Sequence, residues 1–282
     1  MLFALCMKKQ NQKKSSARSK RVLVLSDFHC GHVVGLTPPG WQWPIEQAEP
    51  HKLAIAQTQR IYWDWYESEV REHGPYDVVF LNGDAIDGNG HRSGGTEQLT
   101  TDRQEQAKIA KVCLRPAMNW NPRPKLVCTY GTAYHTGDAE DFESEIPTLY
   151  DGKIGGHEWV SVNGLVFDLK HHCGSSGVPH GRHTAQARER LWNVLWHEAG
   201  NCPKANVIIR SHVHYYSGSF GPNWLALTTP ALQGLGSKYG ERRCSGIVDF
   251  GFLVFDVQPD GGYTWRPVLL EQERTAEKLT EL

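Results

Sequence analysis

The sequence predicts an α/β fold in which a mixed pair of sheets is flanked by helices. Three observations point to it. Short, continuous apolar runs end abruptly in polar residues, segments with helical spacing lie between these runs, and the second half of the chain is the richer in strand patterns. At 282 residues, the chain is long enough for one large domain with its own core.

Four apolar runs predict strands that are buried on both faces, because they lack the alternation of a half-exposed strand. Each run gives way to polar residues or glycine, which indicates a loop at its carboxyl end. The four runs are residues 21–26 (RVLVLS), 77–81 (DVVFL), 125–129 (KLVCT) and 206–210 (NVIIR).

Between these runs, apolar residues recur at the spacing of a helix face. Three such faces are predicted, formed by Ala54, Thr58, Ile61 and Trp65, by Ala107, Ala110, Leu114 and Ala117, and by Ala187, Leu191, Val194 and Leu195. The alternation of strands and helices favours parallel βαβ units.

The second half of the chain adds further strands. Residues 158–162 and 165–170 flank the dipeptide Asn163-Gly164, which is typical of a two-residue hairpin turn. Further strands are predicted at residues 224–229, 251–257 and 263–270, with a Pro-Asp-Gly-Gly turn before the last of them.

Two long loops are predicted at residues 30–50 and 88–103, which are rich in Gly, Pro and polar residues. Residues 21–270, with these two loops included, are expected to form a single domain with no internal linker. Residues 1–20 are expected to be a disordered basic tail, and residues 271–282 a C-terminal tail.

The charges nearly cancel, with 30 Lys and Arg against 31 Asp and Glu, so the whole chain is not a polybasic nucleic-acid binder. A phosphate-bearing substrate would need a local positive feature, which a metal ion can supply.

No apolar run reaches the length of a membrane span, so no membrane partner is expected. Seven cysteines without a CxxC pattern indicate reduced thiols and a cytoplasmic protein.

Aspartates and histidines gather where the apolar runs end. Asp27 and His29 follow the first run as S-D-F-H, and in an extended segment residues i and i+2 point the same way. Later strand ends carry Asp84 and Asp87 (N-G-D-A-I-D), Thr132 and His135 (G-T-A-Y-H), the pair His171 and His172, and His212 and His214 (S-H-V-H).

The carboxyl ends of parallel strands line one crevice in sheets of this type, so these side chains should meet there. Many buried and unpaired polar groups would be costly. Divalent cations resolve that cost, because carboxylate and neutral imidazole are both ligands for them. The conjunction of motifs, in this order, therefore predicts a divalent-metal site.

Over roughly residues 21–257, this order of motifs resembles the calcineurin-like metallophosphoesterases. The resemblance implies a four-layer α/β/β/α sandwich of two mixed sheets with two metals above the sheet edges. It assigns one metal to Asp27, His29, Asp84 and His214, and the other to Asp84, His212 and either His171 or His172, with His171 slightly favoured. Asp84 would bridge the two ions.

The third motif departs from the family pattern G-N-H-[DE]. Thr132 stands where the family has an Asn ligand, and its hydroxyl is a poorer one. The histidine arrives later, as His135, where it would stabilise charge or protonate the leaving oxygen. This G-T-x-x-H form looks like that of phage-encoded members, which would place the protein in the host cytoplasm.

The resemblance implies hydrolysis of phosphate mono- or diesters, nucleotides and nucleic acids among them, by a hydroxide that bridges two metals. His135 and Asp84 would be catalytic. Manganese is the first expectation for the metal, with iron, zinc, nickel or magnesium as alternatives. Arg210 is expected either to contact phosphate or to pair on the surface. The rival interpretations are a degenerate, non-catalytic scaffold of this fold and an unrelated mononuclear hydrolase.

Overall fold

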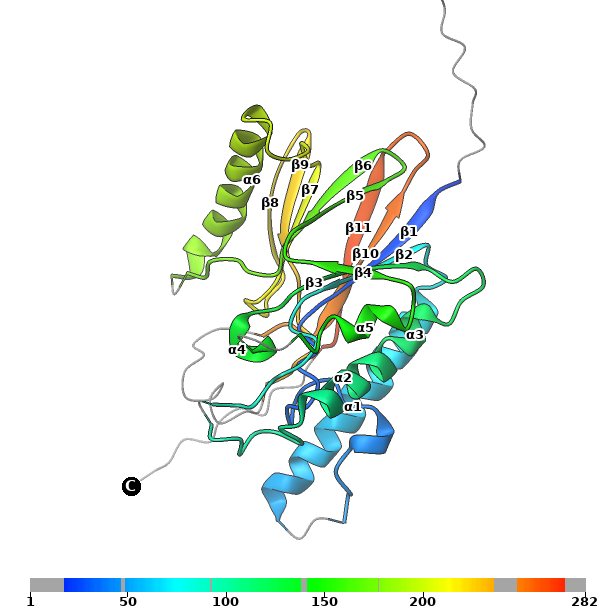
Figure 1. The fold of residues 1–282 in the computed structure, drawn as a ribbon, viewed down its shortest axis with the longest axis vertical. Coiled ribbons are helices and arrows are strands. Elements are labelled where there is room, and N and C mark those ends of the chain that lie inside the picture. Colours follow the sequence, from blue (N-terminus) through cyan, green and yellow to red (C-terminus); the bar gives the residue numbers. More distant parts are fainter. Residues whose placement is uncertain are drawn as a thin grey trace, which may run out of the picture.

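The structure, a computed structural model, describes residues 18–46, 49–91, 93–137, 141–176, 178–235 and 248–271. Two mixed sheets pack face to face and helices cover their outer faces, which makes the predicted four-layer α/β/β/α sandwich (Figure 1). Most of the two expected tails lies outside the described residues. Within the described ranges, no helix is both long and apolar enough to cross a membrane.

The first sheet has the strand order β11-β10-β1-β2-β3-β4. Its strands are β1 (Lys20–Leu25), β2 (Val78–Asn82), β3 (Lys125–Thr129), β4 (Lys153–Gly155), β10 (Gly251–Val257) and β11 (Tyr263–Leu269). Strands β1 to β4 run parallel to one another, whereas β10 is antiparallel to both of its neighbours. The predicted strands of this sheet are confirmed to within one residue.

The second sheet has the order β5-β6-β7-β9-β8. Its strands are β5 (Glu158–Val162), β6 (Leu165–Leu169), β7 (Val207–Arg210), β8 (Ser217–Gly221) and β9 (Trp224–Thr228). The predicted hairpin is β5–β6. The sequence did not predict β4 or β8, because the first is very short and the second is mostly glycine and serine.

Between the two sheets, apolar side chains form a continuous core that includes Val24, Phe80, Phe167, Ile209 and Leu227. Helices cover the outer face of the first sheet and bury a second core against it. They are α1 (Pro50–Glu72), α2 (Arg103–Cys113) and α3 (Arg115–Met118). The predicted loops connect β1 to α1, with one short 3-10 turn η1 (Pro39–Trp41), and β2 to α2.

The predicted apolar face from Ala107 to Ala117 is buried, although it is divided between α2 and α3, whereas that of α1 is wrong by about one residue. Ile61 is 56% exposed, whereas its neighbour Tyr62 and the residue Tyr66 are buried. The larger aromatic rings take the core, and Tyr66 does so without an unpaired hydroxyl, because that hydroxyl donates to the Cys113 carbonyl at 2.7 Å.

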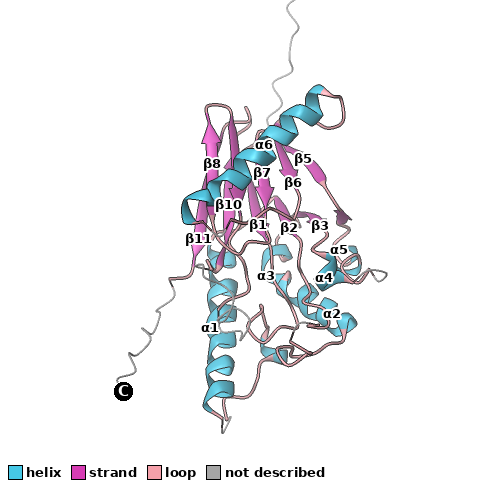
Figure 2. Ribbon diagram, turned by 90° about the vertical axis from the view of Figure 1, so that its left-hand side faces the viewer, coloured by secondary structure: helices cyan, strands magenta, loops and turns pink. Residues whose placement is uncertain are grey.

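One long helix, α6 (Arg182–Glu198), lies across the outer face of the second sheet (Figure 2). Its predicted apolar face is on the outside, since Leu191 and Leu195 are 57% and 48% exposed. Beneath it, Arg210 is fully buried, with its guanidinium 2.7 Å from Asp168 Oδ1 and 2.8 Å from Glu189 Oε2. Both expectations for Arg210 are therefore wrong.

Candidate metal centre

The candidate ligands lie where parallel strands of both sheets end, as predicted. Asp27 and His29 follow β1, Asp84 follows β2, and His171 follows β6, while His212 and His214 follow β7. Backbone hydrogen bonds join these loops to one another. Asp27 N donates to the Gly83 carbonyl and His29 N to the Asp84 carbonyl, each at 3.0 Å.

The backbone at these ligands is left-handed rather than extended. The φ angles are +52° at Asp27, +45° at His29, +50° at Asp84, +73° at His212 and +57° at His214. Asp27 and His29 do converge, as expected, but strand alternation is not the cause. They converge because the chain turns at each ligand, a conformation that non-glycine residues rarely adopt.

Two glycines allow the loops to approach each other closely. A Cβ at Gly83, where φ is +82°, would collide with the His171 ring. A Cβ at Gly131 would collide with the Asp84 carboxylate and backbone. Glycine at these positions therefore lets the β2 and β3 loops close over the ligands.

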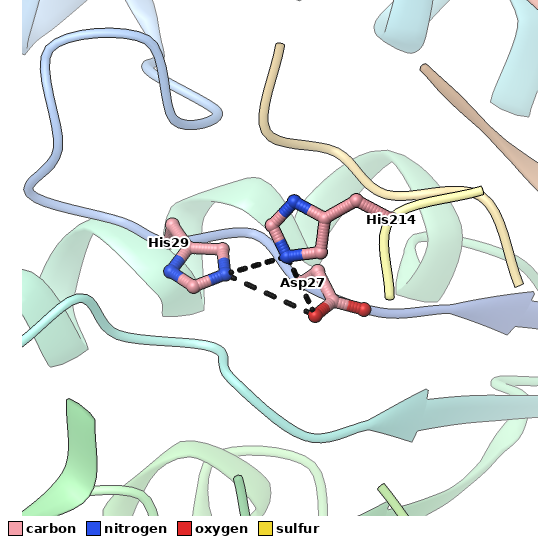
Figure 3. A group of neighbouring side chains, drawn as sticks. All are labelled: Asp27, His29 and His214. Atoms are coloured by element: carbon pink, nitrogen blue, oxygen red, sulfur yellow. Dashed lines mark hydrogen bonds and ion pairs between the residues drawn. The ribbon is translucent and has the colours of Figure 1, made fainter. Parts of the chain in front are cut away.

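Three overlapping groups of side chains could each hold a metal ion, with ligand atoms within 4.8 Å of one another. They are Asp27, His29 and His214 (Figure 3), then His29, Asp84 and His135, and then Asp84, His171 and His212. His29 and Asp84 each belong to two groups. The three groups therefore form one centre rather than three separate sites.

Nitrogen and oxygen atoms converge within this centre. His214 Nε2 lies 3.2 Å from both His29 Nε2 and Asp27 Oδ1. Asp84 Oδ2 lies 2.9 Å from His171 Nε2 and 3.9 Å from the Nε2 atoms of His29 and His135. Asp84 Oδ2 is thus the atom around which the histidines are arranged.

Several of these atoms are buried without a hydrogen-bond partner. Both carboxylate oxygens of Asp27, Oδ2 of Asp84 and Nε2 of His171 form no hydrogen bond of regular geometry, although histidine nitrogens lie as close as 2.9 Å to these oxygens, and both aspartates are fully buried. Leaving such groups unsatisfied is costly, and native proteins rarely do so. Divalent cations would satisfy all four atoms, so the residues fit the predicted metals.

Protonated histidines balance the negative charges of the buried aspartates in this centre. Burial would raise the pKa of Asp27, but His214 and His171 hold it well below its usual range. Burial would lower the pKa of His29, yet the Asp27 and Asp87 carboxylates raise it to about 10. Against the same effect of burial, Asp84 and Asp27 raise the pKa of His171 to about 9.

Two other histidines are neutral instead. Burial and, to a smaller extent, the nearby His171 lower the pKa of His212 to about 4. Burial also lowers the pKa of His135. Both rings therefore carry a lone pair at neutral pH, which is the form that binds a metal or accepts a proton.

The ring orientations are set by partners outside the centre. His29 Nδ1 lies 2.8 Å from Asp87 Oδ1, and Gln98 in turn donates to the other oxygen of Asp87 at 2.7 Å. His171 Nδ1 donates to the Asn82 carbonyl at 2.7 Å, and His135 Nδ1 to the Asp87 carbonyl at 2.8 Å. Each of these contacts turns Nε2 towards the centre, as in metal sites generally.

Thr132 and Glu143 hold the Asp84 loop. Thr132 N–H donates to Asp84 Oδ1 at 2.7 Å, and its hydroxyl lies 3.4 Å from the same oxygen. The buried Glu143 carboxylate accepts from Ala85 N and Gly131 N, both at 2.8 Å. Burial, with a smaller effect of Asp84, raises the pKa of Glu143 to about 7.

The sequence did not single out Glu143, because nothing nearby in the chain marks it.

Of the His171 and His172 pair, the structure brings His171 into the centre, whereas His172 is exposed beside the His212 ring. The expected role of Thr132 as a ligand stays a prediction.

Comparison with known proteins finds similarity in structure only. No family model matches the chain, and no curated protein matches it in sequence. Zinc-bound Vps29 of Entamoeba histolytica is 14% identical with a TM-score of 0.42, over 88% of this chain and 98% of that one. Vacuolar protein sorting 29 of Cryptosporidium parvum is 12% identical with a TM-score of 0.45, over 91% of this chain and 100% of that one. An archaeal phosphodiesterase is 13% identical with a TM-score of 0.42, over 89% and 99%. All three similarities are distant.

Proposed function

We propose that this chain is a metal-dependent phosphoesterase that hydrolyses phosphate mono- or diesters on two divalent cations. One observation carries the proposal. Two fully buried aspartates present oxygens without a regular hydrogen bond to a group of histidine nitrogens at the edge where the strands of both sheets end. Nothing in a purely structural role requires such a set of unsatisfied atoms.

The geometry favours a division of ligands that follows the resemblance. Asp27, His29, Asp84 and His214 would hold one cation, and Asp84, His171 and His212 the other. Asp84 would be shared, because its Oδ2 faces both His29 and His171. A mixed set of imidazole and carboxylate suits manganese, iron or zinc, of which manganese is the first to test.

When bound, divalent cations at this site would supply Lewis-acid polarisation of the phosphoryl oxygens. The protein residues supply position and proton transfer. His135 Nδ1 donates to a carbonyl, so its Nε2 holds the lone pair and faces the centre. With a side chain 16% exposed, His135 can reach the substrate, accept a proton from water at Nε2 and donate it to the leaving oxygen.

The test is hydrolysis of bis-p-nitrophenyl phosphate and p-nitrophenyl phosphate by metal-stripped protein reloaded with Mn²⁺. We expect turnover that falls by roughly three orders of magnitude in Asp84→Asn, because several kcal/mol of charge stabilisation are lost. Asp64→Asn is the matched control, since Asp64 is an exposed aspartate on α1. It should keep full activity.

The relative rates of the two esters would separate the branches of the proposal. Faster diester turnover would lead next to nucleotides and nucleic acids as substrates, and faster monoester turnover to phosphatase substrates. Hydrolysis of neither ester, or equal rates for the Asp84 variant and the parent, would overturn the proposal and favour the non-catalytic scaffold.

A further inference from the structure

Helix α6 buries mostly polar side chains and exposes most of its large apolar ones. Its buried residues are Ala185, Gln186, Glu189 and Asn193, three of which are polar, whereas Leu191, Trp192 and Leu195 are 57%, 45% and 48% exposed. A helix on the surface of a globular protein normally buries its apolar side. The opposite arrangement indicates that the apolar side of α6 has a partner elsewhere.

The orientation of α6 is fixed by hydrogen bonds beneath it. Glu189 Oε2 accepts from Arg210 Nε at 2.8 Å and from Lys170 Nζ at 2.9 Å. Asn193 Nδ2 donates to Asp168 Oδ2 at 3.1 Å. Turning the helix to bury its leucines would leave Arg210, which is fully buried, without one of its partners. The outward apolar face is therefore a stable feature of the fold.

The outward residues follow the spacing of a helix-pairing seam. The stripe repeats at steps of four, three, four and three residues, through Thr184, Arg188, Leu191, Leu195 and Glu198. Its two leucines lie between the charged residues Arg188 and Glu198. That alternation keeps one stripe facing a partner helix. Trp192 lies beside the stripe and stacks on Trp196 at a centroid distance of 6.0 Å, which widens the apolar surface.

We propose that this stripe is the interface of a symmetric dimer, in which α6 packs antiparallel to α6 of a second copy. In one register, every position of the stripe except Thr184 faces a suitable partner on the second copy. With the two-fold axis midway between Leu191 and Leu195, each of these leucines faces the other one on the second copy. The same register sets Arg188 opposite the partner subunit's Glu198, and Glu198 opposite the partner subunit's Arg188.

Charge supports a second copy over an unrelated partner. In the described part of the chain, neither Arg188 nor Glu198 forms an ion pair with another residue, and both are exposed. One stripe that carries leucines between opposite charges at its two ends is complementary to itself in antiparallel pairing. The 17-residue helix spans about 25 Å, so the interface is small and dissociation in the micromolar range is expected.

This inference is independent of the proposed function, and sedimentation equilibrium from about 1 to 200 μM protein tests it. We expect a monomer–dimer equilibrium with a limiting mass twice the chain mass of 31.8 kDa. Leu191→Glu should weaken the dimer by at least 100-fold, because two buried carboxylates would face apolar side chains. Ile61→Glu on α1, a residue equally exposed at 56%, is the matched control and should not change it.

A charge exchange tests the register. Arg188→Glu and Glu198→Arg should each weaken the dimer by about tenfold, and the double variant should restore it, because the charges again oppose each other on the two copies. Monomer at all concentrations, a dimer indifferent to Leu191→Glu, or a double variant no better than the single ones would overturn the proposal. The charge variants lie on the surface, so thermal unfolding should confirm that they fold.

Discussion

The candidate ligands occupy backbone conformations that cost free energy. A non-glycine residue in the left-handed region loses about 1–2 kcal/mol relative to the right-handed one. Of the seven described non-glycine residues with positive φ, five are the candidate ligands Asp27, His29, Asp84, His212 and His214. Strain of this kind persists where surrounding contacts hold it and is concentrated at functional sites. The backbone geometry therefore points to the same residues as the side chains do.

Glu143 is the residue whose role the structure reveals most directly. Its carboxylate joins the loop of Asp84 to that of Thr132, through Ala85 N and Gly131 N. In Glu143→Gln, one of these N–H groups would face an amide NH₂ instead of an acceptor. We expect weaker binding of the cation shared by Asp84 and a kcat lowered by about 10- to 100-fold, as for other partners outside a metal site.

Manganese titration followed by electron paramagnetic resonance would measure that effect, and Glu145→Gln, an exposed residue on α5 (Glu145–Thr148), is its control. Glu143→Asp should recover part of the affinity, because a carboxylate is restored. Unchanged manganese affinity in Glu143→Gln would show that the contact does not position Asp84.

Metal binding should release protons. The pKa values of about 10 for His29 and about 9 for His171 keep both rings protonated at pH 7 in the metal-free protein. Each must lose its proton before Nε2 can bind a metal, so about one proton should leave per cation. Affinity should therefore rise about tenfold per pH unit at each site up to pH 9, and fall as the solution becomes more acidic.

Isothermal titration calorimetry at pH 7 in two buffers of different ionisation enthalpy gives the proton count directly. The same heat in both buffers would mean that no proton leaves, which would contradict metal binding by protonated His29 and His171.

Among the elements, α6 depends on ionic contacts where a helix usually depends on apolar ones. Arg210 of β7 joins Asp168 of β6 to Glu189 of α6. Removing one member of a buried ionic network leaves the others uncompensated, at a cost of about 3–5 kcal/mol. We expect Arg210→Met to lose stability of that order in urea unfolding, while Arg188→Met, on the exposed side of α6, should lose less than about 1 kcal/mol. Equal losses would contradict this account of α6.

The same elements show what the sequence could predict. The strands that carry the ligands were predicted to within a residue, because a strand buried on both faces needs an unbroken apolar run. The buried faces of α1 and α6 were not predicted correctly. On α1, the rings of Tyr62 and Tyr66 are buried in place of Ile61. On α6, apolar spacing does not reveal that Glu189 is drawn into the interior by its contact with Arg210. Side-chain partners far apart in sequence decide which face of a helix is buried.

For the whole molecule, the sequence predicted the residues of the site better than the contacts that orient them. The order of the motifs brought Asp27, Asp84 and His171 to one edge because strand ends meet there. The contacts that orient them were not predicted, because Glu143 and Gln98 come from loops without a local signal. The left-handed turns at the ligands also leave no mark in the pattern of residues.

Metals should stabilise the entire fold, because the centre joins loops of both sheets. A ligand at 100 times its dissociation constant adds about 2.7 kcal/mol to the free energy of unfolding. For a chain of this size, that corresponds to a rise in Tm of roughly 4–5 °C for each cation bound. Differential scanning calorimetry of chelator-treated protein with and without Mn²⁺ measures the rise. Asp84→Asn should show a smaller one, and an equal rise in that variant would place the metal elsewhere.

The central claim is that one centre holds two cations, with Asp84 between them. The most direct measurement is the metal content per chain, by mass spectrometry of the elements, after equilibration with Mn²⁺ and removal of free metal. We predict two manganese ions per chain in the parent protein and one or none in Asp84→Asn, with Asp64→Asn unchanged. One ion or fewer in the parent protein would contradict the two-metal centre.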